Sequence, residues 1–214
     1  MKEIKYKINT STDITPVRDL EEKNAIEIYE YDLYWQSIYI DILGSKKSEL
    51  DDFENINLGY ISGTYFKIND MEDDGVDKID VFDSISQETY EVYKSLYDVD
   101  GIERGEYIGI NGNVFYIDRF YIEKEYKNLG IGSKALIDLE IILKYSLNCK
   151  VGNFILLPSA IEKIDNSLQM VKDNEAHLKL TNKLKKFYKH FGFKKIKNSN
   201  YMYFNTDYKM KDTE

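Results

Sequence analysis

The segment from Val114 to Leu147 constrains the fold more than any other part of this 214-residue chain. It begins with VFYIDRFYI (114–122), in which aromatic and β-branched residues predominate, as they do in buried strands. A short turn with two glycines follows, and apolar residues then recur on one helical face, at positions 131, 135, 136, 139, 142, 143 and 147. The sequence therefore predicts a strand, a tight glycine-containing turn and a helix in direct succession.

The turn between this strand and this helix contains Lys127, Gly130 and Gly132. A helix N-terminus has unpaired backbone N–H groups and a partial positive charge, and glycine lets a phosphate approach that backbone closely. The arrangement predicts a turn that binds a pyrophosphate. Two commoner phosphate motifs are excluded, because the chain has no G-x-x-x-x-G-K-[ST] sequence and no third glycine in the spacing G-x-G-x-x-G.

The remaining segments extend this pattern in both directions. In the second half, GNFILL (152–157) reads as a buried strand, 175–191 as an amphipathic helix ending at Gly192, and 193–196 with 201–204 as a closing hairpin. In the first half, 25–43 and 58–68 read as strand regions, 70–80 as an acidic loop, and 85–96 as a helix for which Ser84 and Ser86 offer caps. Alternation of strands and helices in the second half predicts an α/β sheet.

Two segments resemble motifs of the GNAT superfamily of acyl-CoA N-acyltransferases. Lys127-x-x-Gly130-x-Gly132 is similar to the family's motif A, Arg/Gln-x-x-Gly-x-Gly/Ala, with lysine in the first position. LKKFYKHFGF (184–193) is similar to motif B, a helix that carries tyrosine and ends in Gly-Phe. The resemblance covers roughly 112–205. Two stretches depart from it: 158–174 looks like an insertion, and 70–101 is long for the family.

The resemblance implies a mixed, largely antiparallel central sheet flanked by helices, with a splayed strand pair that holds acyl-CoA. The chain, 1–214, is expected to form a single domain in which 112–205 is the recognisable core and 1–111 a divergent N-terminal part. The implied activity is that of an N-acetyltransferase, which moves an acetyl group from its cosubstrate acetyl-CoA to an amine by direct attack. No metal is expected, because Cys and His do not cluster and 70–81 lacks the glutamate that closes a calcium-binding loop.

The same resemblance assigns roles to individual residues. Backbone amides near Phe120 and Ile122 would bind the pantetheine arm and polarise the thioester, and Tyr188 would protonate the departing thiolate. The residues expected to bind the cofactor are Phe120, Tyr121, Ile122, Lys127, Asn128, Leu129, Gly130, Ile131, Gly132 and Ser133. Asp118 is a candidate general base from strand periodicity, which places it on the face of Phe120 and Ile122. His177, His190 and Cys149 are interpreted as structural or surface residues.

Charge is distributed unevenly along the chain. Residues 1–107 contain 11 Lys/Arg against 26 Asp/Glu, a net charge of −15, whereas residues 108–214 contain 18 against 12, a net charge of +6. A basic second half can hold an anionic cofactor, and an acidic first half can attract a cationic acceptor. The net charge of −9 for the whole chain argues against a nucleic-acid partner, and no apolar stretch is long enough to span a membrane. The resemblance implies a small-molecule or peptide amine as the partner, and a homodimer is left open.

The compartment and the class of function are also constrained. Cys149 is the only cysteine, so no internal disulfide can form, and the N-terminus has no apolar run of signal type, which together predict a cytoplasmic protein. Two alternatives to an acetyltransferase stay open. A noncatalytic acyl-CoA-binding module would show CoA affinity without turnover, and an interaction protein with an acidic docking face would bind a basic partner without CoA affinity.

Overall fold

The computed structural model describes residues 4–11, 31–47, 53–104, 111–164, 167–171 and 174–207. Its centre is a seven-stranded sheet in the order β1-β2-β3-β4-β5-β9-β8. The strands are β1 (Ile4–Ser11), β2 (Trp35–Lys47), β3 (Phe53–Phe66), β4 (Val114–Ile122), β5 (Asn153–Leu156), β8 (Lys194–Lys195) and β9 (Met202–Asn205). Every adjacent pair is antiparallel except β4 and β5, so the sheet is mixed and largely antiparallel, as predicted.

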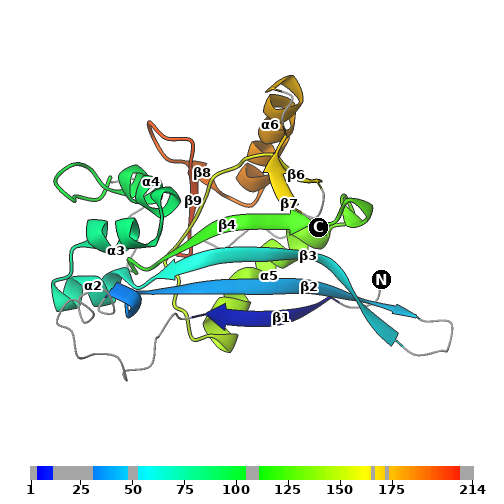
Figure 1. The fold of residues 1–214 in the computed structure, drawn as a ribbon, viewed down its shortest axis with the longest axis horizontal. Coiled ribbons are helices and arrows are strands. Elements are labelled where there is room, and N and C mark those ends of the chain that lie inside the picture. The colour runs from blue at the N-terminus through cyan, green and yellow to red at the C-terminus, as the bar shows by residue number, and fades with distance from the viewer. Residues whose placement is uncertain are drawn as a thin grey trace.

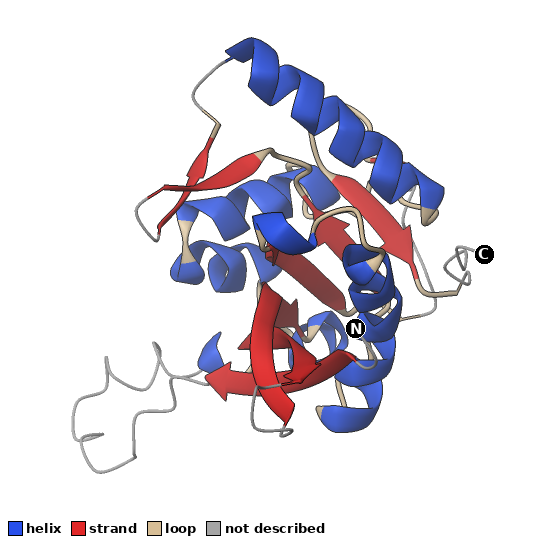
Figure 2. Ribbon diagram, turned by 90° about the vertical axis from the view of Figure 1, so that its right-hand side faces the viewer, coloured by secondary structure: helices blue, strands red, loops and turns tan. Residues whose placement is uncertain are grey.

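Helices flank this sheet on both sides (Figures 1 and 2). The helix α5 (Ile131–Ser146) connects β4 to β5 and lies behind strands β2 to β4 in Figure 1, and α6 (Asn174–His190) precedes β8. Three shorter helices, α2 (Ile68–Asp74), α3 (Lys78–Ile85) and α4 (Gln87–Leu96), gather at the end of the sheet where β3 stops and β4 starts (Figure 1). A separate hairpin, β6 (Ile161–Ile164) with β7 (Ser167–Met170), lies between β5 and α6 in sequence.

The central strand β4 separates two hydrophobic cores because successive side chains of a strand point to opposite faces. Phe115 and Ile117 belong to the core that α5 and α6 cover, whereas Val114 and Tyr116 belong to the core under α2, α3 and α4. All four side chains are almost fully buried. A strand that is apolar on both faces is therefore what a central position between two helical layers requires.

A bulge interrupts this alternation in the middle of β4. Against β3, Arg119 pairs with Ser62 and Ile117 pairs with Gly63, so Asp118 has no partner in the register. Beyond the bulge, Phe120 and Ile122 pack on the same core as Ile117. The strict alternation from which the face of Asp118 was predicted does not hold here, because one extra residue shifts the side-chain pattern.

The strands β4 and β5 are parallel and pair only from Val114 with Asn153 to Ile117 with Leu156. From there β4 continues to Ile122, while β5 ends. The two strands therefore diverge after Ile117, at the position of the bulge. This is the splayed strand pair that the resemblance predicted, and it is produced by a parallel pairing that stops before β4 does.

Most predicted elements are confirmed, with one clear error. The strand at 114–122, the helix from 131, the strand within 152–157, the helix over 175–191 and the closing hairpin are all present. Within 25–43, the structure describes 31–43, where β2 begins at Trp35. The acidic stretch 70–80 is mostly helical rather than a loop: α2 and the start of α3 occupy it on either side of 75–77, and α2 buries Ile68 and Met71 while its acidic side chains stay in solvent. The predicted insertion 158–174 contains the β6–β7 hairpin.

Candidate functional site

A cleft of about 1000 Å³ opens where β4 and β5 diverge. One wall is β4 from Ile117 to Ile122, and the opposite wall is Leu156, Leu157 and the start of the hairpin, at Ser159 to Ile161. The turn before α5 closes one end, and α6 contributes Leu180, Lys183, Leu184, Phe187 and Tyr188. The volume is that of a site for a small organic ligand.

The turn before α5 presents backbone N–H groups to this cleft. Gly130 is the N-cap with φ +78°, Asn128 has φ 62°, and no side chain caps the helix among the described residues. The first intrahelical bond is donated by the Lys134 N–H to the Gly130 carbonyl, 3.0 Å away. The N–H groups of the three preceding residues, Ile131, Gly132 and Ser133, therefore have no acceptor within the helix.

The two glycines leave room in front of those N–H groups. A Cβ on Gly130 would have no atom within 4 Å, and a Cβ on Gly132 would lie 3.6 Å from Ile122 Cγ1 and 3.7 Å from Phe120 Cζ, which is ordinary contact. Only the left-handed backbone of Gly130 requires glycine for conformational reasons. The open space in front of this helix end has the properties of a cradle for a phosphate group.

Of three predicted cofactor-binding residues in and next to this turn, one has its side chain in the cleft and two do not. Lys127 lines the cleft, and its Nζ lies 5.4 Å from the centre of the Tyr121 ring. Leu129 and Ile131 do not line the cleft. Leu129 is 63% exposed, and Ile131 is 2% exposed and packs in the core beneath α5. Any role of these two residues in the turn is limited to their backbone.

The backbone of β4 also faces the cleft at the predicted positions. The Glu123 N–H donates to the Leu58 carbonyl at 2.9 Å, and Ile122 pairs with Gly59 in the next register position. In an antiparallel pair the residues alternate between bonding to the partner strand and bonding away from it. The N–H and C=O groups of Phe120 and Ile122 are therefore directed away from β3, toward the side where β5 no longer pairs.

The Tyr188 side chain enters the cleft from the last turn of α6. Its ring packs between Phe187 and Phe193, with ring centres 5.2 Å and 5.5 Å apart. The described residues provide no hydrogen bond to its hydroxyl group. Burial raises the pKa of Tyr188, so the phenol keeps its proton at neutral pH and is able to donate it.

A group of charged side chains occupies the cleft beside the β4 bulge. The Arg119 Nη1 donates to Asp118 Oδ1 and lies 3.5 Å from Glu88 Oε1, and the Tyr116 hydroxyl donates to the same Glu88 oxygen at 2.6 Å. Burial raises the pKa of Asp118, and Glu88 adds to this rise, while Arg119 opposes it. Asp118 is therefore a stronger base than an exposed aspartate.

Sequence reasoning missed several residues that line the cleft. The helix predicted over 175–191 was given a site role only at Tyr188, but it also contributes Leu180, Lys183, Leu184 and Phe187 to the cleft. Glu88 was not recognised because it lies outside the segment that resembles the family. Ser159, whose Oγ is 3.3 Å from His177 Nε2, was part of an unassigned insertion. The sequence contains no local signal that these residues meet β4.

Two other expectations concern metals and membranes. The described residues contain no group of three His, Cys, Asp or Glu side chains that could hold a metal ion. Within the same residues, no helix is long and apolar enough to cross a lipid bilayer. Cys149 is buried, and burial raises the pKa of its thiol, so it lacks the exposed thiolate of a nucleophile.

Comparison with known proteins gives distant structural neighbours only. No protein-family model matches the chain, and no curated protein matches it. One similar solved structure is described as the crystal structure of the KacTA-DNA complex, with 13% identity, a TM-score of 0.41, and 95% of this chain and 94% of that chain covered. Another is AtaT complexed with acetyl-methionyl-tRNAfMet, with 12% identity, a TM-score of 0.36 and 96% of each chain covered. These values assign no function.

One expectation from the sequence, the exclusion of nucleic acid, needs correction. Nucleic acid was excluded as a partner, yet both structures are described as complexes that contain nucleic acid, one with DNA and one with a tRNA. The exclusion does not stand, because it was based on a net charge of −9 for the whole chain. Net charge does not prevent a local basic surface from contacting phosphates, and the second half of this chain is itself basic.

Proposed function

We propose that this protein is an N-acetyltransferase that takes the acetyl group of acetyl-CoA and transfers it to an amine. The observation that carries the proposal is the position of the α5 N-terminus, whose uncapped N–H groups open into a cleft formed by the divergence of β4 and β5. A long ligand with a pyrophosphate at one end and an extended arm fits this combination. The two motifs that resemble the GNAT superfamily lie on the same cleft.

The binding roles follow from the direction of the polar groups. The N–H groups of Ile131, Gly132 and Ser133 would hold the pyrophosphate, with the Lys127 ammonium nearby. The backbone of Phe120 and Ile122 would bond the extended pantetheine arm in the place that a neighbouring strand otherwise takes. The chain thus contributes mainly backbone groups, which is consistent with a motif defined mainly by its glycines.

The chemical roles belong to two titratable groups that line the cleft, Asp118 and Tyr188. Acetyl-CoA supplies an activated acetyl group, and the acceptor nitrogen bonds to the acetyl carbon while the carbon–sulfur bond breaks. Asp118, directly or through a water molecule, accepts the proton that the amine loses. Tyr188 donates its proton to the departing sulfur, and solvent restores it. A cleft amide of β4 polarises the thioester carbonyl.

The proposal is tested by two measurements on the same preparation. Isothermal titration with CoA measures cofactor binding, and a thiol-release assay with acetyl-CoA measures transfer to a panel of primary amines on different carriers, aminoacyl-tRNA included. We expect CoA binding and amine-dependent thiol release. Absence of CoA binding would overturn the proposal, whereas binding without transfer to any acceptor would favour a noncatalytic acyl-CoA-binding module.

A further inference from the structure

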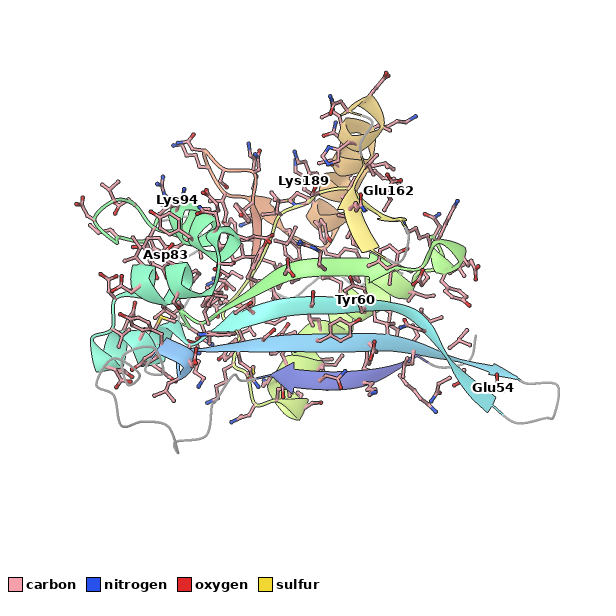
Figure 3. All side chains as sticks on the ribbon, viewed as in Figure 1. Glu54, Tyr60, Asp83, Lys94, Glu162 and Lys189 are labelled. Atoms are coloured by element: carbon pink, nitrogen blue, oxygen red, sulfur yellow. The ribbon has the colours of Figure 1, made fainter. Side chains whose placement is uncertain are left out.

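Glu88 reaches the cleft from a part of the chain that has no counterpart in the resemblance. It lies in the first turn of α4, within the helical segment 68–96 that connects β3 to β4. Figure 3 shows the side chains of this segment, with Asp83 labelled on α3 and Lys94 on α4. Among the residues of 68–96, Glu88 is the one that lines the cleft. The helices of 68–96 therefore bring a carboxylate to a site that is otherwise built by β4, β5, α5, α6 and the β6–β7 hairpin.

The orientation of Glu88 is not explained by the helix that carries it. An acidic residue in a first turn can interact favourably with the helix dipole. The N-cap of α4 is Ser86, whose Oγ already accepts from the Thr89 N–H at 3.2 Å. The Glu88 carboxylate instead bonds across to β4, where it accepts from Tyr116. It is held on the strand rather than at its own helix end.

At the bulge, two carboxylates lie next to one guanidinium group. Glu88 and Asp118 flank the single guanidinium of Arg119, and one arginine balances one of the two carboxylates. Among the described residues, Glu88 Oε1 receives both contacts and Glu88 Oε2 receives none. All three side chains keep between 36% and 41% of their surface exposed, so a ligand can reach them. An exposed ion pair of this kind adds little to stability.

We propose that Glu88 and Asp118 together bind the protonated amine of the acceptor, and that Glu88 determines specificity for a cationic acceptor. The inference rests on the proposed function, because it identifies the acceptor end of the same cleft. The two carboxylates lie beside the point where β4 diverges from β5, and Tyr188 lies in the same cleft. The ammonium would sit against Glu88 Oε2 and pass its proton to Asp118 before the nitrogen attacks.

The test uses a simple ammonium ion rather than the unidentified acceptor. The protein is saturated with CoA and titrated with n-butylammonium chloride at about 0.15 M salt, where charges further apart than about 8 Å are screened. Chemical-shift changes of backbone amides report the affinity and the location, and 1-butanol serves as the uncharged ligand of the same shape. We expect the wild type to bind butylammonium, to discriminate against butanol, and to show shifts at β4 and α4.

Two matched variants on α4 separate the site from general acidity. Glu88→Gln keeps an acceptor for Tyr116 but removes the charge, and it should weaken butylammonium binding about fivefold, as for one unit charge lost at about 4 Å in water. Glu91→Gln removes an exposed charge on the same helix, where Glu91 bonds Lys94, and it should leave binding unchanged. CoA affinity and melting temperature should stay the same in both variants.

The outcomes distinguish this inference from the proposed function. If CoA binds but butylammonium does not, or if both variants bind it as tightly as the wild type, the ammonium site is overturned while the acetyltransferase proposal stands. If Glu91→Gln weakens binding as much as Glu88→Gln, general acidity is responsible and the inference is again wrong. If CoA itself does not bind, the proposed function fails first.

Discussion

Tyr188 and Asp118 both have a pKa raised by burial in the cleft, and the same direction of shift has different consequences for a donor and an acceptor of protons. For the tyrosine, a raised pKa keeps the phenol protonated over the whole neutral range. For the aspartate, a raised pKa makes the carboxylate a stronger base but converts it to the acid at a higher pH than usual. Each shift therefore gives a specific expectation for a substitution.

Replacing Tyr188 by phenylalanine tests the proton donor. Phenylalanine keeps the ring contacts with Phe187 and Phe193, so the melting temperature and CoA affinity should change little. General acid catalysis typically contributes about 10²–10⁴-fold, so single-turnover thiol release should fall at least about tenfold. Phe187→Leu, which alters the neighbouring ring without removing a hydroxyl group, is the control for packing. A wild-type rate in Tyr188→Phe would assign the proton to water.

Replacing Asp118 by asparagine tests the base through the pH profile. The base form of Asp118 is present above its raised pKa, so the wild-type rate should fall as pH is lowered through a value above the ordinary range of aspartate. Asparagine cannot titrate, and the acid limb should disappear together with most of the rate. The measurement is kcat/KM against pH for both proteins. An acid limb that persists in Asp118→Asn belongs to another group.

At the scale of single elements, the N-terminus of α5 is the feature on which cofactor binding depends. Gly132→Asp would place a carboxylate among the free N–H groups, and the ordinary contacts that a Cβ would make at this position indicate that the fold accepts a side chain there. Repulsion of the pyrophosphate should lower CoA affinity at least about tenfold in calorimetry. Gly132→Asn has the same shape without the charge and should lose less. Equal affinities in the wild type and the aspartate variant would mean that the phosphate binds elsewhere.

The helix α4 offers a test of how firmly Glu88 is positioned. Ser86 caps this helix through Thr89 N–H, and replacing a serine N-cap by alanine typically costs about 1 kcal/mol of stability. Ser84→Ala is the matched control, because the Ser84 hydroxyl donates to the Val81 carbonyl inside α3 and caps no helix start. Urea denaturation of both variants should give a clear loss for Ser86→Ala and almost none for Ser84→Ala. A similar decrease in the free energy of unfolding in both variants would show that the Ser86 cap does not stabilise α4.

At the scale of the whole molecule, the charge asymmetry predicts how acceptor capture responds to salt. Residues 68–96 contain nine acidic side chains against two lysines, and this segment contributes Glu88 to the cleft. Raising the ionic strength from about 0.01 M to about 0.15 M shortens the screening length from about 30 Å to about 8 Å. The acceptor KM should therefore rise about threefold or more with little change in kcat. A KM that is independent of salt would argue against a cationic acceptor.

The sequence by itself determined the elements that depend on neighbouring residues. Helical periodicity of 3.6 residues and strand alternation of 2 residues are local patterns, so β4, α5, α6 and the glycine turn could be predicted within one or two residues. The acidic segment 70–80 was the exception. Its many charges favoured a loop, although Ile68 and Met71 are buried by the helix that forms there. The splayed strand pair was predicted only from the resemblance of two motifs to those of a known family.

Only the tertiary structure decided which side chains share the cleft. The bulge at Asp118 arises because the residues on either side of it pair with Ser62 and Gly63, more than 50 positions earlier in the sequence. No pattern within β4 itself predicts this bulge. Glu88 meets Tyr116 across 28 positions of sequence, and Leu129 and Ile131 turn away from the cleft although they flank the glycines. Contacts between distant segments depend on how whole elements pack, and packing is a property of the folded chain rather than of any short stretch of residues.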